Sequence, residues 1–145
     1  MALTADSFPE TVARGVGSII ALNGTTIYAG ALVAIDANGF ATNWADTSGF
    51  VGLAGTALAQ AIGDTSASPN VEVSLNTSGP IYAKVAVTGS TGQTDVGAKC
   101  YATDENTFNL SASTNVYAVG IVTRYYSGTT CDVRLFTPAE YVAQI

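Results

Sequence analysis

The sequence has no histidine, and this absence removes several kinds of chemistry at once. Serine–histidine–aspartate and cysteine–histidine catalysis both need an imidazole, which is also the commonest transition-metal ligand in proteins. The two cysteines are too few for a four-cysteine zinc site. Carboxylates and lysines are the remaining reactive groups, and they form no recognisable catalytic pattern. We therefore expect a protein that is not an enzyme and that needs no metal or other cofactor.

Charge is scarce as well. Charged residues make up 11% of the 145 residues, against roughly 25% in ordinary soluble domains. The net charge is −6, and the five cations are scattered: Arg14, Lys84, Lys99, Arg124 and Arg134. Binding to a nucleic-acid backbone or to an anionic membrane requires clustered cations, so we expect neither partner. So little charge is typical of surfaces that contact other proteins, and also of hydroxyl-rich all-β proteins.

Long apolar runs are missing too. The start, Met1 to Asp6, has neither the basic region nor the apolar stretch of a secretory signal. No run reaches the roughly 18 apolar residues of a membrane-spanning helix. These features predict a protein that is made in a cytoplasm and kept there until it assembles.

A long internal repeat is present. The order Gly-Ala, apolar run, Asp-x-Asn and Phe occurs over residues 30–40 and again over 97–108. The similarity continues at residues 51–53 and 119–121, and at 71–75 and 131–135. A repeat that covers most of a chain indicates a duplicated structural unit. We place the two copies at about 20–88 and 89–137, and residue types that occur in both are predicted to be structural.

The pattern along the chain predicts a mainly β fold. Runs of Val, Ile, Thr, Tyr and Ala alternate with turn residues about every ten positions, which is typical of a β-barrel or sandwich. The expected strands are 17–22, 31–36, 39–44, 52–61, 70–75, 81–87, 98–103, 107–110, 116–126 and 130–136. Residues 1–15 are expected to form an extended N-terminal arm, and residues 16–145 a single domain. A short helix is expected over 138–145, with Thr137 as its N-cap.

Two motifs suggest ligands but have simpler interpretations. Asp36 with Asn38, and Asp104 with Asn106, offer oxygen ligands for calcium but lack the spacing of an EF-hand. We favour Asx turns, in which the aspartate side chain caps its own turn. Residues 92–99 imitate a phosphate-binding P-loop, yet an Ala separates the last Gly from Lys99 and a strand is expected to follow. We therefore reject a P-loop.

The cysteines and aromatic residues also have two interpretations each. Cys100 and Cys131 align in the repeat with Val33 and Val71, which favours two buried thiols, and a Cys100–Cys131 disulfide is the alternative. Trp44 and Tyr126 are expected in the core or at a subunit contact, and stacking on a sugar ring is the alternative. In the C-terminal helix, Tyr141, Val142 and Ile145 would form one apolar face.

The first copy resembles a known family over about residues 30–87. The residues that carry the resemblance are Gly30-Ala31-Leu32-Val33-Ala34-Ile35-Asp36, Val51-Gly52-Leu53, Val71-Glu72-Val73-Ser74-Leu75 and Gly79-Pro80-Ile81-Tyr82. This order is similar to that of the phage-lambda-like head decoration proteins, the capsid cement proteins of tailed bacteriophages. The second copy, over residues 97–136, is a departure from the smaller family members, which have one unit.

The resemblance implies a structural virion protein. Such a protein would bind the outer surface of the expanded phage capsid, contact the major capsid protein and stabilise the shell by bridging its subunits. It would do so as a homotrimer, or as a monomer given the second copy. The expected contact residues are Leu3, Phe8, Pro9 and Val12 in the arm, with Tyr141 and Ile145 in the tail. The alternative is a non-catalytic carbohydrate- or receptor-binding β-domain of a phage fibre or cell-surface protein.

Overall fold

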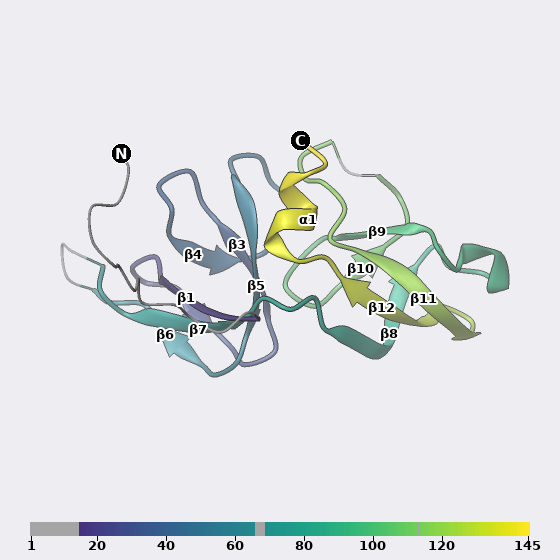
Figure 1. The fold of residues 1–145 in the computed structure, drawn as a ribbon, viewed down its shortest axis with the longest axis horizontal. Helices are drawn as coiled ribbons and strands as arrows, with labels where there is room; N and C mark the ends of the chain where they lie inside the picture. Colours follow the sequence, from purple (N-terminus) through teal and green to yellow (C-terminus); the bar gives the residue numbers. More distant parts are fainter. Residues whose placement is uncertain (1–14, 66–68, 113) are drawn as a thin grey trace, which may run out of the picture.

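The computed structural model describes residues 15–65, 69–112 and 114–145. The fold is mainly β, with 46% of residues in strands and 6% in helices. Two similar β-rich halves lie side by side along the long axis of the molecule, and the one short helix, α1 (Pro138–Val142), lies between them (Figure 1). The predicted fold class is confirmed. The predicted arm precedes the described residues.

The first half contains a five-stranded sheet. Its strand order is β1 (Val16–Ile20), β7 (Glu72–Asn76), β5 (Gly52–Ala57), β3 (Leu32–Ile35) and β4 (Ala41–Asn43), with antiparallel neighbours throughout. The sheet curls until its two edges meet at one place, where Ala21 forms a parallel bridge with Ala41. A separate pair, β2 (Thr26–Ile27) and β6 (Ala61–Ile62), accompanies this sheet.

The second half is a closed barrel. Around the barrel its strands are β8 (Ile81–Thr88), β12 (Thr130–Leu135), β11 (Gly120–Ser127), β9 (Lys99–Ala102) and β10 (Phe108–Asn109). A short 3-10 turn, η1 (Gln93–Asp95), precedes β9. The barrel closes where β10 pairs in parallel with β8, through Phe108 beside Val87 and Asn109 beside Thr88.

The two halves share one topology. The order β1-β7-β5-β3-β4 corresponds strand by strand to β8-β12-β11-β9-β10, and the Ala21–Ala41 bridge corresponds to the parallel pairing that closes the barrel. The structure differs from the sequence-based boundary at one strand. β8, which the sequence assigned to the first copy, pairs with β12 and β10 and so opens the second unit.

Both faces of the central strands β3 and β5 are buried. One face points into the first-half core, where Val33 and Ala54 pack with Val73 and Leu75. The opposite face carries Leu32, Ala34 and Leu53, which belong to the same apolar cluster as the barrel interior. Helix α1 packs on β5 at this face, and its Tyr141 is 2% exposed. The apolar cluster of the barrel interior therefore extends onto the outer face of the first half, while the interior of the first half forms a second cluster.

The start of α1 is fixed by a reciprocal cap. The Thr137 hydroxyl accepts a hydrogen bond from the Glu140 backbone N–H at 3.2 Å, and the Glu140 carboxylate accepts one from the Thr137 N–H at 3.1 Å. Arg134 of β12 donates two further bonds to that carboxylate, at 3.0 and 3.2 Å. This arrangement satisfies backbone donors that a helix start leaves free, and it confirms Thr137 as the N-cap.

Gly52 and Gly120 align in the sequence repeat but have different surroundings in the structure, where the β9 partner of Gly120 is Cys100 and the β3 partner of Gly52 is Ile35. A Cβ on Gly120 would overlap the Arg134 carbonyl oxygen of β12, whereas a Cβ on Gly52 would make an ordinary 3.4 Å contact with the Ile35 side chain. We expect Gly120→Ala to lower the free energy of unfolding by about 1–3 kcal/mol, as overpacking does. Urea titrations measure this free energy. In the same titrations, Gly52→Ala should lower the free energy of unfolding by clearly less. Equal losses would contradict the close approach of β11 and β12.

The cap also predicts a pH dependence. Hydrogen bonds from Arg134 and from the Thr137 backbone lower the pKa of Glu140. Because the folded-state pKa lies below the unfolded one, this contribution is complete above the usual glutamate pKa and is lost as the pH falls through the lowered value. We expect Glu140→Gln to cost about 0.5–1 kcal/mol at pH 7 and less at pH 3. Glu72→Gln is the control, and a penalty for Glu140→Gln that does not change with pH would contradict the assignment.

Candidate functional site

The sequence-predicted contact residues have different positions in the structure. Leu3, Phe8, Pro9 and Val12 lie outside the described residues, and the last residue, Ile145, is 67% exposed. Tyr141 does not share an exposed face with it. Its ring packs edge-on against Trp44, with centroids 5.5 Å apart, because α1 is held against the core. Of the two tail residues, Ile145 alone is exposed for contact with a partner.

The two cysteines are free and fully buried in the core cluster that contains the barrel interior. The structure therefore agrees with the expectation of two core thiols, and it does not contain the alternative disulfide. Burial, with a smaller contribution from the neighbouring Cys131, raises the pKa of Cys100 to about 12. The Cys131 sulfur lies 3.2 Å from the Ser90 hydroxyl. Neither thiol has the exposure that a reactive cysteine needs, and the pKa of Cys100 is raised where a reactive thiol needs a lowered one.

The Asp-x-Asn pairs are Asx turns, as expected. The Asp36 carboxylate accepts hydrogen bonds from the backbone N–H groups of Asn38 and Phe40, at 2.8 and 2.9 Å. Asp104 accepts one from Asn106 at 3.0 Å. Among residues 15–65, 69–112 and 114–145, no three potential metal ligands gather at one place.

The segment that imitates a P-loop is closed by its own carboxylate. Asp95 accepts hydrogen bonds from the backbone N–H groups of Thr91 and Gly92, at 2.7 and 3.1 Å, and these bonds lower the pKa of Asp95. The segment leads through η1 into strand β9, whereas a P-loop opens a helix. Within the described ranges, no helix is long and apolar enough to cross a membrane.

The two aromatic side chains considered for sugar stacking, Trp44 and Tyr126, make contacts with other residues of the chain. Trp44 is 1% exposed, and its indole N–H donates a hydrogen bond to the Ala102 carbonyl oxygen at 3.0 Å, so Trp44 belongs to the core. The Tyr126 ring is contacted by two cations, with the Arg124 guanidinium 4.6 Å and the Lys84 amine 5.3 Å from the ring centre. The Tyr126 hydroxyl donates to Asp132 at 2.9 Å. The Tyr126 ring therefore packs against side chains of the same chain, which does not favour its stacking on a sugar.

The edge strand β1 is the first candidate for a binding surface. In the described part of the chain it pairs with β7 alone, in a regular antiparallel register from Val16 opposite Asn76 to Ile20 opposite Glu72. Val16 and Ile20 are 54% and 38% exposed. A groove of about 680 Å³ follows this face, and it is lined by Val16, Gly17, Ser18, Leu58, Glu72 and Ser74. One charged side chain, that of Glu72, lies among these six residues.

The corresponding edge of the second half is protected. In β8, the pairing with β12 is irregular between Val85 and Tyr82, because a β-bulge holds Lys84 in a left-handed conformation at φ 53°. The Lys84 N–H bonds to the Asp132 side chain at 2.9 Å. Bulges and lysines are the usual devices that prevent another strand from pairing with an exposed edge. The strand β1 has neither a bulge nor a lysine. The two halves share one topology, but they differ in the protection of this edge.

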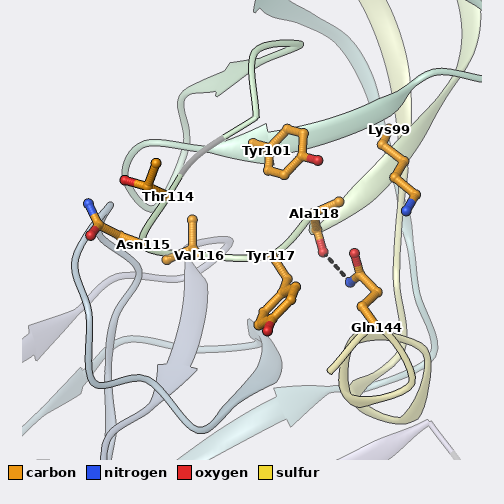
Figure 2. Close-up of a pocket in the computed structure, with 8 residues that line it drawn as sticks. All are labelled: Lys99, Tyr101, Thr114, Asn115, Val116, Tyr117, Ala118 and Gln144. Atoms are coloured by element: carbon orange, nitrogen blue, oxygen red, sulfur yellow. Dashed lines mark hydrogen bonds between the residues drawn. The ribbon is translucent and has the colours of Figure 1, made fainter.

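A second candidate is a hollow of about 480 Å³ between β9, the segment 114–118 and the end of α1 (Figure 2). Lys99 and Tyr101 of β9 form one side. Tyr117 and Ala118 form the opposite side with Gln144, whose amide N–H donates to the Ala118 carbonyl oxygen at 2.8 Å. No sequence motif indicates this hollow, because its residues come from three distant segments of the chain.

The burial of the thiols predicts their reactivity. We expect the native protein to react with a disulfide reagent such as DTNB at neither cysteine, at pH 7 or at pH 9, because both sulfurs are inaccessible and the pKa of Cys100 is about 12. After denaturation without reductant, two thiols per chain should react. Fewer than two would show a disulfide and contradict the structure. A sample that is reduced beforehand is the control.

Comparison with known proteins places the chain in no family. No protein-family model matches it, and no curated protein or solved structure matches it at a significant level. Function must therefore be inferred from the residues themselves. The described residues offer two surfaces for this purpose, the unprotected edge of β1 and the hollow beside β9.

Proposed function

We propose that this protein is a phage capsid decoration protein, which binds the outer surface of the expanded shell and stabilises it by bridging capsid subunits. The observation that carries the proposal is the unprotected edge of β1, with a groove beside it whose lining has one charged residue, Glu72. The sequence resemblance over residues 30–87 supports the same function. The fold also suits it, because decoration needs binding surfaces and no catalytic group.

The edge of β1 fits an extended segment of the major capsid protein. A strand that is added to a sheet edge gains main-chain hydrogen bonds, and its alternate side chains enter the pockets beside that edge. On β1 the outward positions are Val16, Ser18 and Ile20, with Leu58 nearby across β7. An added strand with apolar residues at alternate positions would cover these side chains. A basic residue in that strand could pair with Glu72.

The arm and β1 are adjacent in the chain. Residues 1–14 carry Leu3, Phe8, Pro9 and Val12 and lead directly to Gly15 and β1. Contacts made by the arm and by the β1 edge would therefore form one continuous binding surface on the shell. A homotrimer, or a monomer whose two halves act together, would engage several capsid subunits at once and gain affinity by multivalency.

Such binding would stabilise the shell by differential affinity. A ligand shifts an equilibrium between two states only to the extent that it binds one of them better. A decoration protein that binds the expanded shell, and neither the unexpanded nor the broken one, raises the free energy needed to open that shell. Its place in the virion would be the outer capsid surface, after synthesis in the host cytoplasm.

A lysine on β1 tests this function. Ser18 lies at the position where the second half has its bulge and Lys84, so Ser18→Lys copies a protective residue from one half into the other. We expect Ser18→Lys to weaken binding to purified expanded shells by about tenfold or more, because a charge would be buried against an added strand. The measurement is sedimentation of the protein with shells.

The matched control is Ala86→Lys, an exposed position on β8. This variant should decorate shells like the unchanged protein, and both variants should keep the thermal midpoint of unfolding. Shell binding by Ser18→Lys at full affinity would contradict the assignment of β1 to the capsid contact.

Deletion of residues 1–14 tests the arm separately. If the arm contributes apolar contacts to the shell, the shortened protein should sediment with expanded shells only at higher concentrations. A shortened protein that decorates shells as well as the full chain would remove Leu3, Phe8, Pro9 and Val12 from the contact.

A further inference from the structure

The hollow beside β9 lies on a face whose counterpart in the first half is covered. In the first half the outward residues of β3 and β5 are Leu32, Ala34 and Leu53, which are at most 1% exposed, and α1 packs on β5. In the second half the repeat puts Lys99 and Tyr101 at the first two of these positions. Lys99 is exposed and Tyr101 is only partly buried. The same face of the fold is therefore apolar and filled in one copy, and polar and open in the other.

The opposite side of the hollow is held in place by the end of α1. The Tyr117 backbone N–H donates to the Tyr141 hydroxyl at 3.4 Å, and Gln144 holds the Ala118 carbonyl oxygen. Val116 and Ala118 are buried, at 5% and 0% exposure. These contacts fix the backbone of the segment, so the hollow exists before any ligand arrives. Pre-formed concave sites of this size are typical of small-molecule binding.

The groups around the hollow differ in what they can bind. The Lys99 amine is a cationic donor, and the Tyr101 hydroxyl can donate or accept. The Gln144 amide is oriented by the hydrogen bond from its N–H to Ala118, which leaves its Oε1 as an acceptor (Figure 2). The Tyr117 side chain is 44% exposed and presents an aromatic surface at the rim. Thr114 and Asn115 add polar groups at the other end.

We propose that this hollow binds an acidic sugar residue, such as a hexuronate of a polysaccharide. The sugar carboxylate would pair with Lys99, in a charge-assisted hydrogen bond that a neutral sugar cannot form. Ring hydroxyls would donate to the Gln144 Oε1 and bond with the Tyr101 hydroxyl. The apolar face of the sugar ring would lie against the aromatic ring of Tyr117 at the rim. This site is separate from the β1 edge and does not depend on the proposed capsid contact.

The test is a titration of the full-length protein with three probes, followed through the amide chemical shifts. These are trigalacturonate, neutral maltotriose and tricarballylate, which has carboxylates but no sugar ring. We expect saturable shifts with trigalacturonate at residues 99–101, 114–118 and 144. The two other probes should bind at least about tenfold more weakly, because each lacks one of the two recognised features.

Two variants test whether Lys99 is the charged group that binds the sugar carboxylate. Lys99→Gln should weaken trigalacturonate binding by about tenfold or more, whereas Lys84→Gln, the same change at the other lysine of the chain, should leave it unchanged. The proposal is overturned by any of three results: no saturable shift with trigalacturonate, equal affinity for maltotriose or tricarballylate, or equal losses in the two variants. Because Lys99 is exposed, its replacement should not disturb folding, and an unchanged thermal midpoint verifies this.

Discussion

The packing of α1 against β5, on the outer face of the first half, is the interaction on which the rest of the structure depends. Leu32, Ala34 and Leu53 belong to one apolar cluster with Tyr141, Trp44 and the barrel interior, whereas the interior of the first half forms a second cluster. Without this contact the central strands of the first half would expose an apolar face to water. The cap at Thr137 and the Arg134–Glu140 pair hold the helix where this burial requires it.

The duplicated fold carries its specific features where the two copies differ. The edge strand β8 has a bulge and Lys84, whereas β1 is regular and uncharged. The outer face of β3 and β5 is buried, with α1 packed on β5, whereas the equivalent face of the second half carries Lys99 and Tyr101 and stays open. A difference that the common scaffold does not require is the natural place to look for function, and both proposals rest on such differences.

The sequence predicted much of the scaffold, because local patterns determine it. Alternating apolar residues gave the strands, Asp36 and Asp104 gave their turns, and Thr137 gave the helix start. It missed β2 and β6, which are two residues long and carry no pattern. The sequence repeat aligned Cys131 with Val71. In the structure Cys131 lies opposite Val85 of β8, and the corresponding residue of β1, Ile19, lies opposite Val73, so the counterpart of Cys131 is Val73. Strand register and surface hollows depend on tertiary contacts, which a local pattern does not contain.

Hydrogen exchange tests most directly whether the edge of β1 is the contact with the shell. Amide exchange followed by mass spectrometry would compare peptides covering β1 and β8 in the free protein and on expanded shells. We expect exchange to slow on shells across Val16–Ile20, where an added strand would supply hydrogen bonds, and to stay unchanged across the bulged part of β8. Unchanged exchange in β1 on fully decorated shells would contradict this contact.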